Sequence, residues 1–312
     1  MTIHRKLSSA VLGVALVLGI TPLASLVLAA ETGIEQYIGA APIQFADPTA
    51  AADAFKAALA ANDFDGLARL LGLDPAKLKD AEGIMDRFEE IRQGAAKLLS
   101  MGGADDLKII SIGDKVWPFP FPIHKGTDGK WAFDTVAGIE EIVNRRVGEN
   151  ELQAIATARA YVDAQRDYAS DDHDDDGVLE YAQKLVSSAG KTDGLYWPIE
   201  QGDGDSPAGS FVDQAAMDKA KAGDGYFGYR FRILSRQGNN VAGGRYNYII
   251  NNNMIAGFAL IAWPVNYAET GVNSFMVNHA GIVYEKDLGP ETEAIATNTF
   301  RFNPNKTWDI AN

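Results

Sequence analysis

The sequence contains no cysteine among its 312 residues. Disulfides, thiol nucleophiles, zinc–thiolate sites and iron–sulfur clusters are therefore excluded. Basic residues are also scarce, because 28 Lys and Arg stand against 42 Asp and Glu, which gives a formal net charge of −14. A nucleic-acid binder needs Lys and Arg to displace counterions from phosphates, and an anionic lipid surface attracts the same residues. The composition therefore argues against nucleic acid and disfavours docking on anionic lipid.

Familiar catalytic patterns are missing too. The sequence has neither a G-x-S-x-G nucleophile elbow nor a G-x-x-x-x-G-K-[ST] phosphate loop, which are typical of α/β-hydrolases and P-loop proteins. Beyond residue 30 the histidines are His124, His173 and His279, and none has the H-E-x-x-H spacing of zinc proteases. His173 lies among carboxylates, where it either recruits a transition metal or stands as a neutral surface histidine.

An export leader is expected at the N-terminus. A short basic segment precedes an almost wholly apolar stretch over 10–30, and Val27 and Ala29 suit the −3 and −1 positions of a signal-peptidase site. We therefore predict a signal peptide over 1–29 and a periplasmic or secreted product, with an uncleaved membrane anchor as the alternative. No later stretch of about 18 apolar residues follows, so no membrane span is expected after cleavage.

Residues 30–148 are predicted to form an α+β domain of helices and an antiparallel sheet. Asp47 followed by Pro48 is typical of a helix start. Helices are expected over 48–61, 63–71, from 84 to the Gly102-Gly103 pair, and 136–147, and strands over 107–112, 115–123 and 130–134. This order is similar to the nuclear-transport-factor-like fold, which often houses a pocket, although such a fold by itself implies no activity.

A run of alternating prolines marks the strand expected over 115–123. Pro118, Pro120 and Pro122 all lack an N–H on the same side of that strand. An edge strand facing solvent tolerates this, whereas a central strand does not. A polyproline-type ligand is the alternative. The aromatic residues between the prolines favour a packed edge strand.

Residues 149–312 are predicted to form a long helix packed on an antiparallel β-meander. Helices are expected over 149–169 and 178–189, and an extended loop over 190–225 that is either functional or mobile. Alternating apolar residues then predict strands over 226–233, 246–250, 255–263, 274–277 and 282–285. Turns recur about every ten residues between these strands, as expected for a meander.

An acidic loop between the two predicted helices is the best candidate for chemistry. Asp172, Asp174 and Asp176 alternate and are followed by a glycine, as at the start of an EF-hand-like calcium loop. Glu180 falls at position 9 of such a loop, but Gln183 stands at position 12, where a bidentate Glu is usual. We predict a Ca²⁺ site at Asp172, Asp174, Asp176 and Glu180. The alternative is a solvated loop in which Asp176 caps the next helix.

Three acidic residues near the C-terminus offer a second, weaker hypothesis. Glu269, Glu285 and Asp287 would form an acid–base pair if neighbouring strands brought two of them together. Carboxylates on strand surfaces are common without such a role.

Aromatic residues offer a third hypothesis. Tyr196, Trp197 and Pro198, together with Trp263 and Tyr267, could make a ligand face, although most such aromatics pack in cores. A cavity enclosed by Trp117, Phe121 and Trp131 would instead favour a carrier built on the N-terminal domain.

Several segments together resemble an exported bacterial family catalogued as domain of unknown function 2950. They are residues 161–165 (YVDAQ), 228–234 (GYRFRIL), 262–265 (AWPV) and 283–289 (VYEKDLG), with VWPFPFP at 116–122 in support. The resemblance covers nearly the whole mature chain and implies no catalytic residues. The second half also resembles a type II secretion pseudopilin headgroup, a class that places a calcium loop near its sheet. Here a whole domain separates the leader from that half, so the resemblance does not imply fibre assembly.

The sequence therefore predicts an exported, non-enzymatic protein associated with the cell envelope. It would act as a binding or interaction module for an unidentified envelope protein or polymer, with calcium ordering its second domain. Two alternatives stay open: a hydrolase acting on envelope polymer or peptide, and a small-ligand carrier that uses the N-terminal domain.

Overall fold

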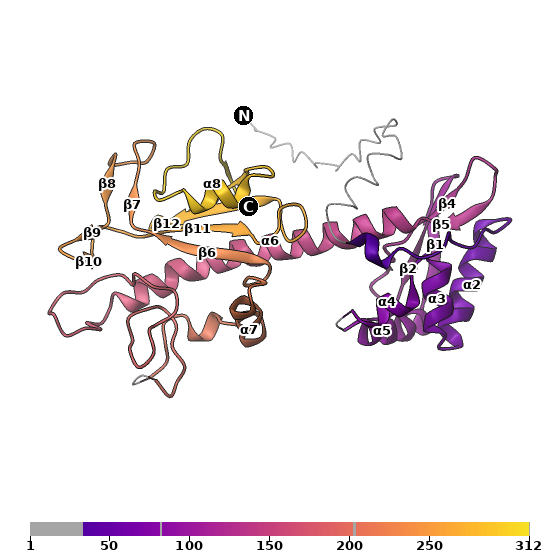
Figure 1. Cartoon of the computed structure of the whole chain (residues 1–312), viewed down its shortest axis with the longest axis horizontal. Helices are drawn as coiled ribbons and strands as arrows, with labels where there is room; N and C mark the ends of the chain where they lie inside the picture. Colours follow the sequence, from indigo (N-terminus) through magenta and orange to yellow (C-terminus); the bar gives the residue numbers. More distant parts are fainter. Residues whose placement is uncertain (1–33, 82, 202–203, 312) are drawn as a thin grey trace, which may run out of the picture. The chain divides into compact units, whose positions relative to one another are not determined.

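The computed structural model describes residues 34–81, 83–201 and 204–311. The chain divides into two compact units, with the boundary between Glu140 and Glu141. Both units combine helices with antiparallel strands (Figure 1), which confirms the predicted α+β class. The predicted leader over 1–29 lies outside the described residues, so cleavage after Ala29 stays a prediction.

The helices of the N-terminal unit begin where acidic caps predict. The 3₁₀ helix η1 (Ile34–Tyr37) is followed by α2 (Pro48–Ala60), α3 (Phe64–Leu70), α4 (Pro75–Lys79) and α5 (Ile84–Lys97). The carboxylates of Asp47, Asp63 and Asp74 accept backbone N–H groups in the first turns of α2, α3 and α4, and thereby satisfy donors that a helix start leaves unpaired. The predicted starts at Pro48 and near Asp63 are confirmed.

The sheet of this unit contains a strand that the sequence did not predict. Strands β1 (Leu99–Gly103), β2 (Leu107–Ile112), β3 (Trp117–Pro118), β4 (Ile123–Lys125) and β5 (Trp131–Phe133) pair antiparallel in the order β1-β2-β4-β5, with β3 also beside β2. The prediction that the preceding helix runs to Gly102 is wrong. Leu98 already has extended backbone, because β1 gains ladder hydrogen bonds with β2 in the register Leu99↔Ile112.

The proline segment forms a much shorter strand than predicted. Only Trp117 and Pro118 lie in a ladder with β2, and Phe119 N–H adds one bond to a carbonyl of that strand. The prolines that follow have no N–H with which to extend the ladder. Phe119 and Phe121 are buried in the core, so this segment is not a free polyproline ligand. Gly138 lies directly against the Phe121 ring, since a Cβ there would overlap that ring.

One helix replaces the two predicted around residue 148. Helix α6 runs without interruption from Thr135 to Tyr168. The predicted domain boundary at 148/149 therefore falls inside a helix. Gly148 lies between the two predicted helices, and one glycine costs a helix only about 1 kcal/mol relative to alanine, so it does not interrupt α6. Buried side chains lie on both sides of Gly148, with Ile139 and Val143 before it and a stripe from Ala154 to Tyr168 after it.

The C-terminal unit is built on the predicted meander. Strands β6 (Tyr229–Leu234), β11 (Ala259–Pro264), β12 (Asn273–Asn278), β13 (Tyr284–Asp287) and β14 (Asp309–Ile310) form an antiparallel sheet in the order β14-β13-β12-β11-β6. Helix α6 packs on this sheet, with the rings of Tyr161 and Phe258 at 5.6 Å. The strand expected over 255–263 begins only at Ala259, and every residue of β11 is buried.

Short ribbons and one helix complete the unit. Strand β7 (Arg236–Gln237) pairs with β8 (Tyr246–Asn247), and β9 (Ile249–Ile250) pairs with β10 (Asn253–Met254). The single strand expected over 246–250 is thus split between two ribbons. Helix α8 (Thr292–Thr297) packs beside β11.

The helix predicted over 178–189 is absent. Its backbone bonds to other segments instead: Tyr181 N–H donates to Met254, Ser187 N–H to Tyr196, and Tyr196 N–H to Leu185. These tertiary partners replace the bonds that a helix would make. The extended loop predicted over 190–225 is partly helical, since it contains η2 (Gly209–Phe211) and α7 (Gln214–Ala222).

Candidate functional site

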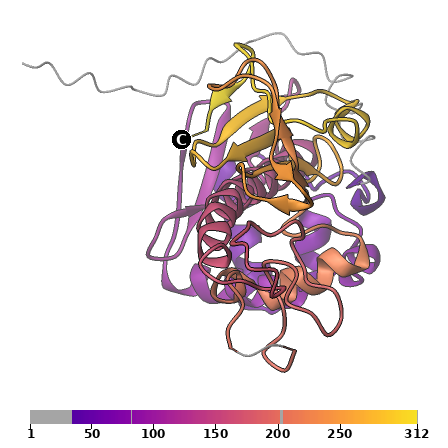
Figure 2. The same cartoon turned by 90° about the vertical axis from the view of Figure 1, so that its left-hand side faces the viewer.

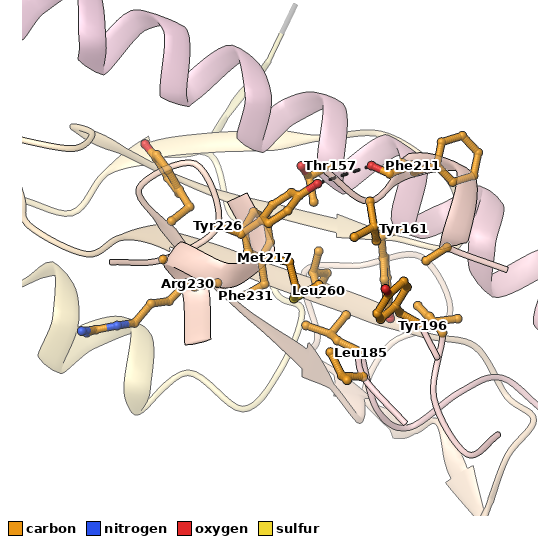
Figure 3. Close-up of a pocket in the computed structure, with 18 of the residues that line it drawn as sticks. Thr157, Tyr161, Leu185, Tyr196, Phe211, Met217, Tyr226, Arg230, Phe231 and Leu260 are labelled. Carbon is orange, nitrogen blue, oxygen red and sulfur yellow. Dashed lines mark hydrogen bonds between the residues drawn. The ribbon is translucent and has the colours of Figure 1, made fainter. Parts of the chain in front are cut away.

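A largely apolar pocket lies inside the C-terminal unit. Its volume is about 570 Å³, within the range of small-molecule sites. Its walls come from α6, from the segment 185–212, from α7 and from strands β6 and β11; Thr157, Tyr161, Leu185, Met217, Phe231 and Leu260 represent them (Figure 3). Figure 2, which looks along α6, shows the meander above this helix and the segment with α7 below it.

A buried amide holds one wall of the pocket in place. The Gln165 side chain, fully buried on α6, donates to Ala182 O at 2.8 Å and accepts from Ala182 N at 2.8 Å. It also donates to the Tyr161 hydroxyl at 3.0 Å. The Gln165 amide thus makes the two backbone hydrogen bonds with Ala182 that a neighbouring strand would make. Ala182 lies just before Leu185 and Val186, which line the pocket. No sequence pattern predicted this structural role of Gln165, because it is simply a polar residue on a predicted helix.

The polar groups of the pocket are mostly tyrosine hydroxyls with protein partners. The hydroxyl of Tyr161 donates to Ala259 O at 3.2 Å, and that of Tyr229 donates to Asn273 O at 2.8 Å. Tyr226 donates to Phe211 O at 3.4 Å, an interaction visible in Figure 3. Burial raises the pKa of Tyr161, Tyr226 and Tyr229, so these hydroxyls stay protonated and uncharged at neutral pH.

Two arginines on β6 complete the lining, and both are engaged elsewhere. Arg230 pairs with Glu293 at 2.8 Å, and Figure 3 shows its guanidinium directed away from the tyrosines. Arg232 donates to the carbonyls of Ala296, Thr297 and Thr299, where it complements the C-terminal end of α8. Burial lowers the Arg232 pKa without removing its charge. Both cations therefore serve the packing of α8.

The predicted aromatic ligand face is brought together only in part. Tyr196 and Trp263 line the pocket, and Tyr196 donates to Gln214 Oε1 at 3.3 Å. Trp197 is buried in the core beside it, and its indole N–H donates to Gly204 O at 3.4 Å. Tyr267 instead donates to Asp287 at 3.2 Å. No local sequence pattern predicted the remaining apolar walls of the pocket, because they come from segments far apart in sequence.

The second aromatic prediction, a cavity around Trp117, Phe121 and Trp131, does not match the packing. Phe121 and Trp131 are buried in the N-terminal core, while Trp117 is 39% exposed. The rings of Phe119 and Phe121 pack at 5.6 Å. The three aromatic residues therefore do not enclose a common cavity as predicted, because Trp117 lies partly at the surface.

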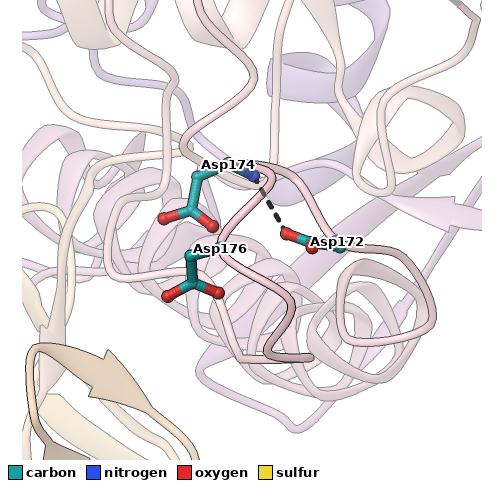
Figure 4. Close-up of side chains that lie close together, drawn as sticks. All are labelled: Asp172, Asp174 and Asp176. Carbon is teal, nitrogen blue, oxygen red and sulfur yellow. Dashed lines mark hydrogen bonds between the residues drawn. The ribbon is translucent and has the colours of Figure 1, made fainter.

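The three aspartates of the acidic loop converge as predicted. One carboxylate oxygen from each of Asp172, Asp174 and Asp176 lies within 4.8 Å of the others, and all three side chains are exposed (Figure 4). Asp172 accepts from Gly177 N at 2.8 Å, and this bond, with weaker ones from the loop, holds the Asp172 pKa below its usual value. Such a set of oxygen ligands could hold a metal ion.

Glu180, the fourth predicted ligand, has another partner. Its Oε2 accepts from Met254 N at 2.8 Å, and the neighbouring Asn253 amide donates to Asp176 Oδ2 at 2.7 Å. These bonds tie the acidic loop to the β9-β10 ribbon. Asp176 also accepts from Val178 N at 2.8 Å, and the prediction that it caps a helix is wrong because no helix follows.

His173 turns away from the carboxylates that suggested a metal. Its ring stacks on Tyr168 with centroids 3.9 Å apart, and its Nε2 lies 3.0 Å from Tyr168 O. His279 is exposed, as predicted, and partial burial of its ring lowers its pKa.

The three carboxylates of the hydrolase hypothesis have separate partners. Glu269 pairs with Arg146 at 3.6 Å, and Asp287 accepts from Tyr267. Burial raises the pKa of Glu285, as do the nearby charges of Glu151 and Asp309. Among the described residues, the aspartates of the acidic loop are the one set of three such groups with ligand atoms within 4.8 Å of one another.

Comparison with known proteins gives a family but no activity. No curated protein and no solved structure matches the chain. None of the helices in the described ranges combines the length and apolarity needed to cross a membrane. A family match covers residues 43–310, most of the chain and both units. The chain therefore belongs to the family described as "Protein of unknown function (DUF2950)".

Proposed function

We propose that this chain is a non-catalytic binding protein whose C-terminal pocket takes a small apolar ligand. The observation that carries the proposal is the pocket itself, about 570 Å³ in volume and walled mainly by apolar side chains. Its described lining includes no carboxylate and no histidine, the groups that most often act as general acids and bases. The carrier alternative is thus retained, but in the C-terminal unit rather than the N-terminal one.

A substitution that fills the pocket tests this proposal. Ala160 lines the pocket from α6 and is half-buried, whereas Ala156 is exposed one turn earlier and does not line it. The uncharged dye N-phenyl-1-naphthylamine fluoresces when it enters an apolar site. We expect the chain to bind the dye with micromolar affinity, Ala160→Phe to weaken binding at least tenfold, and Ala156→Phe to leave it unchanged. No dye binding, or equal effects of the two substitutions, would remove the pocket as the site.

We further propose that the chain is exported and works in the cell envelope with an unidentified protein or polymer. The support is the basic and apolar leader over 1–29, with Val27 and Ala29 before the cut. Intact mass measurement of the chain recovered from periplasm or medium should give a mature protein beginning at Ala30. A full-length mass in the membrane fraction would favour the uncleaved anchor. We also propose that the second unit resembles a pseudopilin headgroup, and this resemblance implies no function.

A calcium ion at the acidic loop is a second proposal, favoured by the convergence of Asp172, Asp174 and Asp176. A ligand that binds only the folded state raises the unfolding temperature. We expect 1 mM Ca²⁺ to raise it by several degrees and EDTA to reverse the change. Asp174→Asn should abolish the shift, whereas Asp175→Asn, an exposed change outside the converging set, should keep it. A shift that survives Asp174→Asn would place the ion elsewhere.

A further inference from the structure

The charges around the pocket bear on which ligands it accepts. Arg230 and Arg232 are the two cations among its described lining residues, and each is already committed, to Glu293 and to the carbonyls at the end of α8. Moving a charge out of water without a partner is strongly unfavourable. A carboxylate or ammonium group enclosed in this pocket would meet no uncommitted opposite charge on the described lining.

One hydroxyl of the lining differs from the others. The tyrosine hydroxyls of the pocket all donate to protein acceptors. Within the described ranges, the Thr157 hydroxyl makes no hydrogen bond to the protein. Thr157 lines the pocket from α6 (Figure 3) and is half-buried. A ligand that placed one hydroxyl beside Thr157 would form a hydrogen bond with it, and no existing hydrogen bond of Thr157 would be broken.

We infer that the pocket selects uncharged apolar molecules with a single hydroxyl, such as aliphatic alcohols, and that Thr157 binds that hydroxyl. The inference rests on the proposed function and narrows it to a ligand class. The apolar walls from α6, α7 and β11 receive the chain of the ligand, while the tyrosines contribute ring surface. Selectivity against charged amphiphiles follows from the two committed arginines.

Competition with N-phenyl-1-naphthylamine tests the ligand class on the full chain. The competitors are 1-decanol, decanoate and decylammonium at pH 7.5, which share a chain length and differ in the charge of the head group. We expect decanol to displace the dye at a concentration at least fivefold lower than either ion. A smaller ratio overturns the inference and leaves the proposed function intact. If the dye itself does not bind, the proposed function fails and the inference with it.

A second measurement tests the role of Thr157. Thr157→Val removes the hydroxyl at nearly constant shape and should weaken decanol binding roughly threefold to tenfold, the net worth of one neutral hydrogen bond. Thr157→Ser keeps a hydroxyl and should retain the affinity. The dissociation constant of the dye is measured in each variant, and the decanol affinity is expressed relative to it, so that a general change of the pocket is separated from loss of the hydroxyl. Equal decanol affinities in the valine and serine variants would overturn the placement of the hydroxyl.

Discussion

The buried amide of Gln165 should be worth several kcal/mol to the C-terminal unit. It satisfies both backbone groups of Ala182, which is 1% exposed, so water cannot replace it. Gln165→Leu replaces the amide by an apolar side chain and leaves an N–H and a C=O buried without partners. Each such group costs about 1–3 kcal/mol, and new apolar contacts of the leucine offset part of that cost. We therefore expect the free energy of unfolding to fall by about 3 kcal/mol.

That loss of stability can be measured as a fall in the unfolding temperature. For a unit of 150–250 residues, 1 kcal/mol shifts the midpoint by about 2–4 °C, so Gln165→Leu should lower it by about 6–12 °C. The assay is differential scanning calorimetry, which can separate the transitions of the two units. Because Ala182 leads into Leu185 and Val186 of the pocket wall, dye binding should weaken in the same variant.

A matched substitution controls for the chemistry of the change. Gln153 lies on the same helix but is exposed, so Gln153→Leu should shift the midpoint by less than about 1 °C, as surface changes usually do. If Gln165→Leu and Gln153→Leu shift the midpoint equally, the buried amide does not hold the wall, and the reasoning from unsatisfied backbone groups is refuted.

Two further predictions concern a close contact and a titration. Gly138→Ala would force a Cβ into the Phe121 ring, and calorimetry should show that it destabilises the protein by about 1–3 kcal/mol. Gly148→Ala on the same helix meets no atom within 4 Å and should stabilise the protein by about 0.5–1 kcal/mol. Burial raises the pKa of Asp193, but its bonds with Lys184 and with the backbone N–H and hydroxyl of Ser188 together outweigh this and hold the pKa at about 2. Because that value lies below the unfolded one, the stabilisation is complete above about pH 4 and is lost as the pH falls toward 2. The midpoint should fall less steeply between pH 5 and 2.5 in Asp193→Asn than in the natural sequence, and parallel slopes would contradict the assignment.

Local patterns predicted the elements whose partners are close in sequence. Helix α2 starts at Pro48 because Asp47 supplies its own cap, which needs no distant segment. The alternation around β6 and the turns that follow it predicted the meander, since each strand of β11, β12 and β13 pairs with the next. The acidic loop was likewise readable, because alternate aspartates within five residues converge through local turns.

The mistaken elements are those whose backbone finds a distant partner. The segment 178–189 has a helical pattern, yet its N–H groups bond to Met254, Tyr196 and the Gln165 side chain. β1 forms because β2 offers it a ladder, although its sequence reads as the end of a helix. Tertiary hydrogen bonds override weak local preferences.

The sequence by itself determined the α+β class, the meander, the convergence of the aspartates and the resemblance that the family match bears out. Only the tertiary structure decided where a ligand could fit. The pocket joins Thr157 on α6, Leu185 on an irregular segment, Met217 on α7 and Leu260 on β11, and no short-range pattern links these positions. Alternation and capping act over a few residues, whereas a cavity is what remains after distant segments have packed.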